Sequence, residues 1–453
     1  MLEKRSKPKF PLTKMILSLA LGILLGITVS LIKIGDRSWV PAAIDKGKQL
    51  AGISKSYSDE VILPVTSSRY QLNPIYQISK VGTMQLAYDK SANKIYAVER
   101  YSGDFYSFDL SGKLHLQLMS NLYDYLSLDQ IRHPNELPMA MDIHISDGFI
   151  YLSVVIPGLE NKCERLSLYK LDFRDENFGT KILESEKKPL FQTPCIRDRE
   201  NSLMWGGRIT SSELSVFLSV GEQRFDRSGF PKSSIISKSE ISNTKSFFGK
   251  ILEIGKNNDR IRIFSSGHRN AQGLYFSPED NLLFESEHGP NGGDEINILR
   301  RGENYGWPYV TFGKPYPKKY PSGEDERNNA NDPALGVDMD LGKFGAKSGS
   351  HFDYNYPLFS WSPGSGAGNL VKISKSSILK EWQGNILVAL MGSEAFLRVI
   401  LGPANEVVFT ELIELQFRIR DFVVTQNGLI ILSTDDGRFL VLSTYDSKLN
   451  QSS

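Results

Sequence analysis

Beyond residue 75, apolar and polar residues alternate with a period of two, which is the pattern of β-strands rather than of helices. Short apolar runs rich in β-branched and aromatic residues recur along the chain, with turn-forming polar residues before them. These runs are residues 94–98, 149–155, 214–220, 281–285, 385–390 and 429–433. Most of them lead into a second run, such as residues 104–109 or 439–442.

These runs read as six copies of one strand unit at irregular spacing, as in a propeller whose top-face loops carry insertions. A β-sandwich would need fewer strands at closer and more even spacing. No sustained amphipathic helix pattern occurs in this part of the chain. We therefore predict an all-β fold, a six-bladed β-propeller with long top-face loops over residues 75–445, followed by a tail at 446–453.

The N-terminus has a different pattern. Residues 1–14 carry five basic side chains and one acidic side chain, and an uncharged run of eighteen residues follows from Met15 to Ile32. At 1.5 Å per residue a helix of this length reaches about 27 Å, enough to cross a hydrocarbon core. The basic flank predicts that the N-terminus stays in the cytoplasm and that the rest is exported. A cleaved signal peptide is the alternative, although Val40–Ala43 makes a poor cleavage site.

We therefore predict a cytoplasmic basic segment at 1–14, a retained transmembrane signal anchor at 15–32, and a tether and lead-in at 33–74. The protein would be a single-pass membrane protein whose propeller is extracytoplasmic, and periplasmic if the source is bacterial. In that oxidising space Cys163 and Cys195 could form one disulfide, and two separate buried thiols are the open alternative.

Composition excludes several classes of function. The chain has 53 Lys and Arg against 52 Asp and Glu, a net charge of +1. A nucleic-acid partner is therefore not expected, because binding by phosphate neutralisation needs a clear basic excess. Two cysteines exclude both a disulfide-dense scaffold and a multi-cysteine metal site.

Residues 266–313 hold the most specific pattern in the sequence. Three ordered motifs occur there: GHRNxQG at 267–273, EHGPxGGDEIN at 287–297 and NYGWP at 304–308. This stretch resembles the soluble quinoprotein sugar dehydrogenases of the glucose/sorbosone dehydrogenase family, aldose sugar dehydrogenase-like six-bladed propellers that use PQQ and calcium. Weaker similarity extends over roughly residues 75–445.

The resemblance implies a site for PQQ, a planar tricarboxylate. Arginine is the side chain best suited to bidentate recognition of a carboxylate. By resemblance, Arg269 and Asn270 face the quinone edge, and Arg418 and Arg420 hold carboxylates. The alternative for each arginine alone is a salt bridge on the surface or between blades.

The resemblance also implies a calcium site. Gly289 and Pro290 match the family positions whose backbone carbonyls bind Ca²⁺, a hard cation that prefers oxygen ligands. Asp294 and Glu295 would raise the negative potential nearby, and capping and pairing within the loop is their alternative role.

The catalytic base of the family is missing from the sequence. In the family's enzymes a histidine, two residues before a Gly-Gly-Arg motif, accepts the proton from the anomeric hydroxyl of the sugar. Alignment on Gly206–Arg208 puts Met204 at that position, and Leu203 where an aspartate would orient the histidine. A thioether cannot act as a base, and base assistance typically contributes about 10²–10⁴-fold in rate. The catalytic residue is therefore unknown, with His133 and His351 as candidate substitutes.

The sequence thus predicts a PQQ- and calcium-dependent oxidoreductase that acts on CH–OH groups of a sugar or related alcohol. Its electrons would pass to a quinone or a soluble carrier. The alternative is a non-catalytic propeller of the same ancestry that binds a ligand or a protein on its top face. This alternative is favoured by three apolar residues at positions where the family has polar ones: Met204, Leu203 and Leu137, the last of which stands at about the position of the family's substrate-side glutamine. The long loops at 221–248 and 314–360 also favour it. The oligomeric state cannot be predicted.

Overall fold

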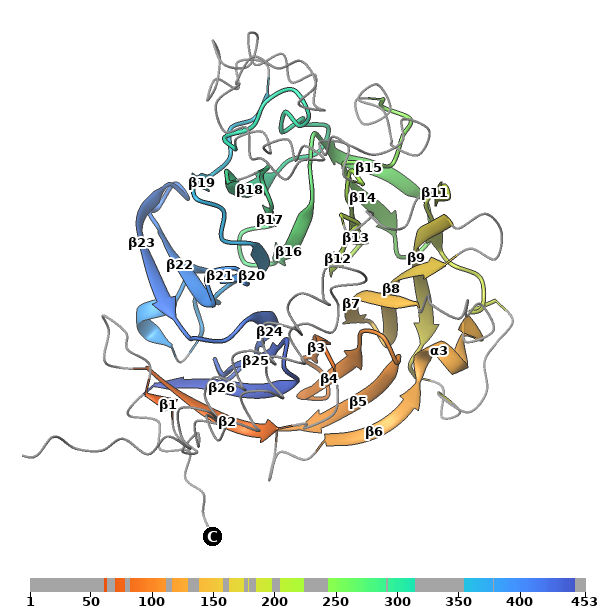
Figure 1. Cartoon of the computed structure of the whole chain (residues 1–453), viewed down its shortest axis with the longest axis horizontal. Coiled ribbons are helices and arrows are strands. Elements are labelled where there is room, and N and C mark those ends of the chain that lie inside the picture. The colour runs from red at the N-terminus through yellow and green to blue at the C-terminus, as the bar shows by residue number, and fades with distance from the viewer. Residues whose placement is uncertain are drawn as a thin grey trace, which may run out of the picture. The chain divides into compact units, whose positions relative to one another are not determined.

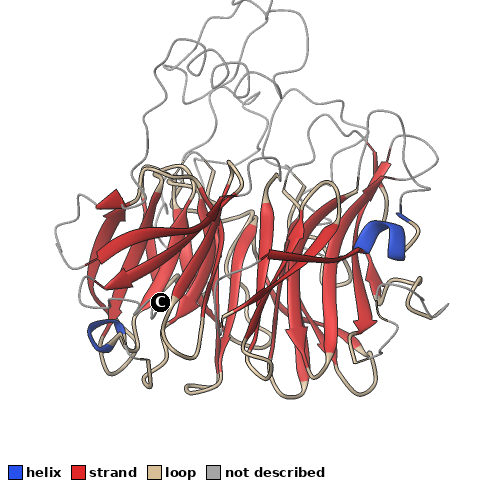
Figure 2. Ribbon diagram, turned by 90° about the horizontal axis from the view of Figure 1, so that it is seen from below, coloured by secondary structure: helices blue, strands red, loops and turns tan. Residues whose placement is uncertain are grey.

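Six antiparallel β-sheets surround a common axis and form the six blades of a propeller (Figures 1 and 2). The predicted all-β, six-bladed architecture is therefore confirmed. The computed structural model describes residues 61–62, 70–77, 82–110, 116–128, 138–157, 163–174, 178, 185–197, 204–223, 243–290, 292–313, 354–377 and 379–444.

The N-terminal predictions lie outside the described residues. These are the basic segment 1–14 and the signal anchor 15–32; the tail 446–453 lies outside them as well. Within the part of the chain that the structure describes, no helix has the length and apolar character to span a membrane.

Each of the first three blades is built around a four-stranded antiparallel meander, in which the chain moves from the axis outward. The first contains β3 (Met84–Asp89), β4 (Lys94–Glu99), β5 (Asp104–Asp109) and β6 (Leu116–Asn121), followed by the one-turn helix α3 (Leu122–Tyr125). The second contains β7 (Met139–Ser146), β8 (Phe149–Pro157), β9 (Cys163–Asp172) and β10 (Phe191–Gln192), with β11 (Ile196–Arg197) also paired to β9. The third contains β12 (Gly206–Ser211), β13 (Ser215–Val220), β14 (Lys250–Gly255) and β15 (Ile261–Ser266).

The fourth and fifth blades repeat this meander, and the sixth is built differently. The fourth contains β16 (Ala271–Ser277), β17 (Leu282–Glu287), β18 (Asp294–Leu299) and β19 (Phe359–Trp361). The fifth contains β20 (Ala367–Lys372), β21 (Ile386–Leu390), β22 (Ala395–Leu401) and β23 (Val407–Glu414), with the 3₁₀ turn η4 (Lys380–Trp382) before β21. The sixth contains β24 (Ile419–Val424), β25 (Ile430–Thr434) and β26 (Arg438–Thr444), then β2 (Tyr70–Gln77) and β1 (Val61–Ile62).

The sixth blade closes the ring by pairing the two ends of the propeller. β2 lies antiparallel to β26, with Tyr70 opposite Thr444 and Gln77 opposite Arg438. The register shifts next to Pro74, at the kind of irregularity where a sheet accommodates proline. The propeller therefore begins before residue 75, which corrects the predicted boundary between lead-in and propeller. This pairing joins segments that are far apart in the sequence, so a local strand pattern does not show it.

The apolar core lies between the blades. Large aromatic side chains are fully buried there, among them Trp205, Phe284, Phe396 and Phe422. The six apolar runs that predict the repeat correspond to β4, β8, β13, β17, β21 and β25, the second strand of every blade. Several of these strands, such as β13 and β21, are buried at every position. A strand buried on both faces has a continuous apolar sequence, which explains why these strands give the strongest signal.

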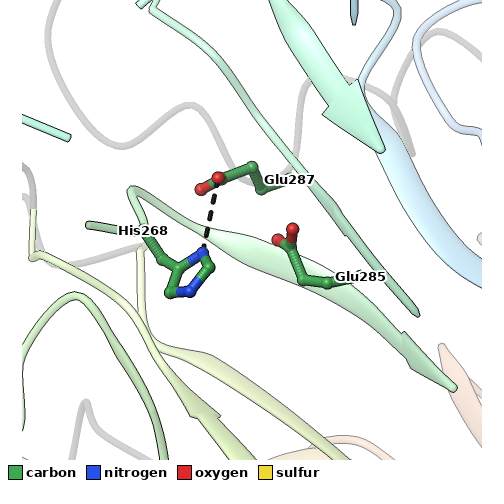
Figure 3. A group of neighbouring side chains, drawn as sticks. All are labelled: His268, Glu285 and Glu287. Atoms are coloured by element: carbon green, nitrogen blue, oxygen red, sulfur yellow. Dashed lines mark ion pairs between the residues drawn. The ribbon is translucent and has the colours of Figure 1, made fainter. Parts of the chain in front are cut away.

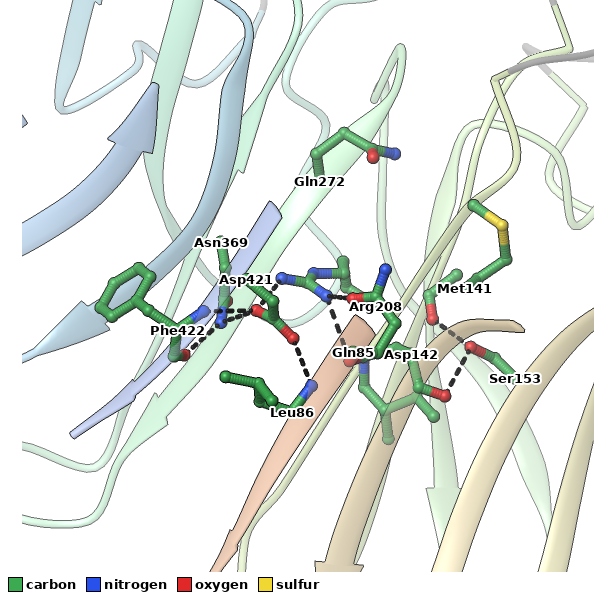
Figure 4. Close-up of polar contacts among 12 residues, drawn as sticks. Gln85, Leu86, Met141, Asp142, Ser153, Arg208, Gln272, Asn369, Asp421 and Phe422 are labelled. Atoms are coloured by element: carbon green, nitrogen blue, oxygen red, sulfur yellow. Dashed lines mark hydrogen bonds and ion pairs between the residues drawn. The ribbon is translucent and has the colours of Figure 1, made fainter. Parts of the chain in front are cut away.

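The axis of the propeller is polar instead (Figure 4). Arg208 on β12 donates from Nη1 to Gln85 on β3 at 2.9 Å and to Asp142 on β7 at 3.1 Å. Its Nη2 donates to Asp421 on β24 at 2.7 Å, and Asn369 on β20 donates to the same carboxylate oxygen at 2.7 Å. Five of the six inner strands therefore meet in one buried hydrogen-bonded network, in which Arg208 is only 4% exposed.

Arg208→Met should strongly destabilise the propeller, because it leaves the buried carboxylates of Asp142 and Asp421 without their cation. We expect a loss of about 3–5 kcal/mol in the free energy of unfolding, measured by chemical denaturation. Arg174→Met is the control, because the ion pair of Arg174 with Asp172 lies on the surface, and it should change stability little. Equal effects of the two substitutions would contradict the role given to Arg208.

Candidate active site

The predicted site residues gather where the inner strands begin. Met204 precedes β12 by two residues, Asn270 directly precedes β16, and Arg418 directly precedes β24. We call this end of the axis the top face. Hydrogen bonds join neighbouring blades along it: the Gly206 amide donates to the Asn270 side chain at 3.2 Å, and Arg418 Nη1 donates to the Met391 carbonyl at 3.3 Å.

Arg269 is almost completely buried and points toward the EHGP loop between β17 and β18. Its Nη1 donates to the carbonyl oxygens of His288 at 2.9 Å and Gly289 at 3.2 Å. Its guanidinium lies over the Trp307 ring, 5.5 Å from the ring centroid. The fold therefore places Arg269 beside the predicted calcium loop and fixes its orientation through backbone carbonyls.

The loop itself is held by hydrogen bonds to Asp294. Asp294 accepts hydrogen bonds from the Gly289 amide at 3.2 Å and, across the blade boundary, from the amides of Ser365 and Gly366 at 2.9 Å each. A Cβ at Gly289 would collide with the Gly293 carbonyl oxygen, so this tight loop requires glycine there. Asp294 thus stabilises the loop through hydrogen bonds to backbone amides, which is the second of the two roles predicted for it. The roles of Gly289 and Pro290 as calcium ligands stay predictions.

Arg418 and Arg420 share one counter-charge. The Nε atoms of both donate to the carboxylate of Asp435 at 2.8 Å. Arg418 is half exposed, with 49% of its side chain accessible, and Arg420 is largely covered. Two guanidinium groups and one carboxylate leave a net positive charge at this point of the top face, which suits an anionic ligand.

Arg100, which sequence reasoning missed, is a third arginine in this region. It directly follows β4, and its Nη2 lies 3.2 Å from Met139 Sδ and 3.5 Å from Met141 Sδ on β7. Burial and the neighbouring positive charge of Arg420 lower the pKa of Arg100 to about 10, so the group remains protonated at neutral pH. The only signal in the sequence was a charged pair, Glu99-Arg100, directly after the apolar residues Ile95–Val98.

Met204, which the sequence alignment places at the family's base position, is buried. Its side chain is 6% exposed, and its carbonyl oxygen accepts from Gln223 Nε2 at 2.9 Å. The candidate substitutes His133 and His351 lie outside the described residues, as do Leu203 and Leu137.

Three histidines lie in the described part of the chain. His144 bonds to Ser211 Oγ at 2.9 Å and lines a cavity of about 890 Å³ further along the inner strands, away from the top face. His268 bonds to Ser265 Oγ at 2.8 Å and stacks on Tyr305. Burial lowers the pKa of His288, in the EHGP loop, so that its ring is neutral at neutral pH.

A buried acidic cluster lies within the fourth blade, next to this loop (Figure 3). Ligand atoms of His268, Glu285 and Glu287 all lie within 4.8 Å of one another, a spacing that could hold a metal ion. Asn297 Nδ2 donates to Glu285 at 2.9 Å, whereas Glu285 Oε1 is buried without a hydrogen-bond partner. Burial, together with the charge of Glu287, raises the pKa of Glu285 and Glu295 well above their ordinary value. The cluster therefore needs either bound protons or a cation.

The sequence left open whether the two cysteines form a disulfide or remain separate thiols. Cys195 is disulfide-bonded in the structure, so the disulfide is confirmed.

Comparison with known proteins places the chain in a family. A family model described as glucose/sorbosone dehydrogenase matches residues 142–441. The chain is 38% identical over 120 residues to the aldose sugar dehydrogenase YliI of Escherichia coli, covering 25% of this chain and 31% of that protein. It is 30% identical over 152 residues to quinoprotein glucose dehydrogenase B of Acinetobacter calcoaceticus, covering 30% and 31% respectively. The matches thus span about a third of the length of these two curated relatives.

The fold agrees with this assignment. The PQQ-bound aldose sugar dehydrogenase of Streptomyces coelicolor superposes with a TM-score of 0.53 at 16% identity, over 84% of this chain and 99% of that structure. The resemblance seen in the three sequence motifs is confirmed, and with it the expectation of an oxidoreductase family whose cofactors are PQQ and calcium. The chain belongs to the glucose/sorbosone dehydrogenase family.

Proposed function

We propose that this protein is a membrane-anchored, PQQ- and calcium-dependent dehydrogenase that oxidises a sugar or related alcohol outside the cytoplasm. The observation that carries the proposal is the gathering of Arg269, Arg418 and Arg420 on the top face of a propeller of this family. Electrons would pass from the cofactor to a quinone or a soluble carrier.

The residues on the top face fit the cofactor. PQQ carries three carboxylates, and Arg418 and Arg420 have only Asp435 between them as a counter-charge. Arg269 and Asn270 would bind the quinone side, as the family pattern implies. When bound, PQQ supplies an acceptor for the two electrons removed from a CH–OH group. The residues of this chain would hold and orient it, and the Gly289 and Pro290 carbonyls would bind the calcium ion.

The substrate side lacks a base at the family position. Met204 occupies that position, and Met139 and Met141 add two further thioethers near Arg100. None of these side chains can accept a proton from a hydroxyl group. We therefore propose that oxidation of ordinary aldoses is slow or absent, although PQQ binds. Met204 is also the observation that favours the second candidate function, a non-catalytic propeller that binds a ligand or protein on its top face.

Restoring the base should restore sugar oxidation if the pocket is otherwise intact. Met204→His, combined with Leu203→Asp to orient the imidazole, should raise PQQ-dependent dye reduction with glucose by about 10²–10⁴-fold. Met204→Gln with Leu203→Asp is the control, because glutamine is polar but not basic. Rapid glucose oxidation by the unmodified protein would contradict the proposal, and would direct attention to His133 and His351 as the base.

Calcium should stabilise the folded propeller, because the ion binds the folded chain and not the unfolded chain. At a 100-fold excess over Kd the gain is about 2.7 kcal/mol, which calorimetry detects as a rise in melting temperature. Glu285→Gln separates the two places where the ion could bind. The stabilisation should persist in this variant if Gly289 and Pro290 hold the ion. Loss of the calcium-dependent stabilisation in this variant would instead place the ion in the acidic cluster. A wild-type melting temperature that calcium does not change would contradict the proposal that the protein binds calcium.

The basic residues before Met15 support an orientation with the N-terminus in the cytoplasm and the propeller outside. Protease added to spheroplasts should digest the propeller and spare a tag placed before residue 1, with a cytoplasmic enzyme as the integrity control. A protected propeller would contradict the orientation. A mature N-terminus near Ala43 would contradict the retained anchor.

A further inference from the structure

The backbone of Arg100 is fixed between the first and second blades. Its amide donates to the Thr83 carbonyl at 2.8 Å. Its carbonyl oxygen accepts from the Ala140 amide at 2.8 Å and from the Tyr123 hydroxyl at 2.6 Å. Tyr123 is itself fully buried. The fold therefore sets the position from which the Arg100 side chain starts.

The Arg100 guanidinium has no anionic partner among the residues that the structure describes. Its hydrogen bonds there go to the sulfur atoms of Met139 and Met141, which are weak acceptors, and its Nε is buried with no partner. The adjacent carboxylate of Glu99 is engaged elsewhere, because it accepts from the backbone amides of Tyr101, at 2.7 Å, and Ser102.

The neighbouring charges do not compensate for this missing partner. Arg420 is close enough for its positive charge to disfavour the protonated form of Arg100. The nearby carboxylate of Asp435 is already shared by Arg418 and Arg420. A largely buried cation beside other cations is costly unless an anion joins the group. The thioethers of Met139 and Met141 exclude water from one side of Arg100, which strengthens its attraction for an anion.

We propose that Arg100 binds a carboxylate of the ligand that occupies the top face. The planar fork of a guanidinium matches a carboxylate, and Arg100 has donor groups left for it. This inference rests on the proposed function in so far as it takes the top face to be the ligand site. The carboxylate could belong to PQQ or to an acidic sugar such as a uronic acid, and the experiment separates these two sources.

Arg100→Met tests the inference, because methionine keeps the length of the side chain and matches its apolar neighbours. Two titrations of the full-length protein are compared. In the first, PQQ binding is monitored by absorbance. In the second, D-glucuronate and D-glucose are added separately, and the rise in melting temperature that each causes is compared. Without ligand, the variant should melt at the same temperature as the wild type or higher, since a cation lacking a counter-charge has been removed. Its affinity for the carboxylate ligand should fall by roughly 10- to 100-fold. Arg100→Lys keeps the charge without the fork and should lose less affinity.

The outcomes show whether the carboxylate belongs to PQQ or to an acidic sugar. They also distinguish a failure of the role proposed for Arg100 from a failure of the proposed function. Weaker PQQ binding assigns the carboxylate to the cofactor. Unchanged PQQ binding with loss of a preference for glucuronate over glucose assigns it to the substrate. Unchanged affinities for all ligands, with a lower melting temperature, would overturn the inference and leave Arg100 a structural role. A wild-type protein that binds glucuronate but no PQQ would overturn the proposed cofactor and not the role of Arg100, whereas binding of neither would overturn both.

Discussion

The ion-pair network of Arg208 at the propeller axis is the interaction on which the rest of the structure depends. One guanidinium joins Asp142 of the second blade and Asp421 of the sixth, and its backbone belongs to the Gly-Gly-Arg segment that follows Met204. Because these groups are buried, the network tolerates little displacement of the inner strands. It therefore fixes five of the six inner strands relative to one another, and the top face lies at the end where these strands begin.

The top face combines two chemical environments. On the side of blades four to six, Arg269 contacts the EHGP loop, whose carbonyl groups suit a hard cation. Arg418 and Arg420 on the sixth blade share the carboxylate of Asp435. On the side of blades one to three, Met139 and Met141 contact Arg100, and Met204 lies at the position where sequence alignment predicts the family's base. The first environment suits the cofactor chemistry of the family, whereas the proposed function assigns no proton acceptor to the second. Under that proposal, cofactor binding and sugar turnover would be separable in this protein.

The sequence revealed the repeat but not the strands that form the site. Every apolar run that predicted a blade is a second strand, buried on both faces, whereas the inner strands carry Arg208, Asp142 and Asp421 and so lack a continuous apolar pattern. The pairing of β2 with β26 was missed because it joins distant segments. The motif residues Arg269 and Arg418 were found through family resemblance. Arg100 was not, since its significance lies in the lack of an ion-pair partner among the described residues, which only the fold reveals.

The central claim is that the top face is a PQQ site even though methionine, Met204, stands at the predicted position of the family's base. A titration of the full-length protein with PQQ in the presence of calcium, monitored by absorbance, tests it most directly, once circular dichroism has shown the protein to be folded. The account predicts saturable binding of one PQQ per chain, lost when Arg418 and Arg420 are both replaced by methionine. Absence of saturable binding by the folded wild-type protein would contradict the claim and favour a propeller that binds a different ligand.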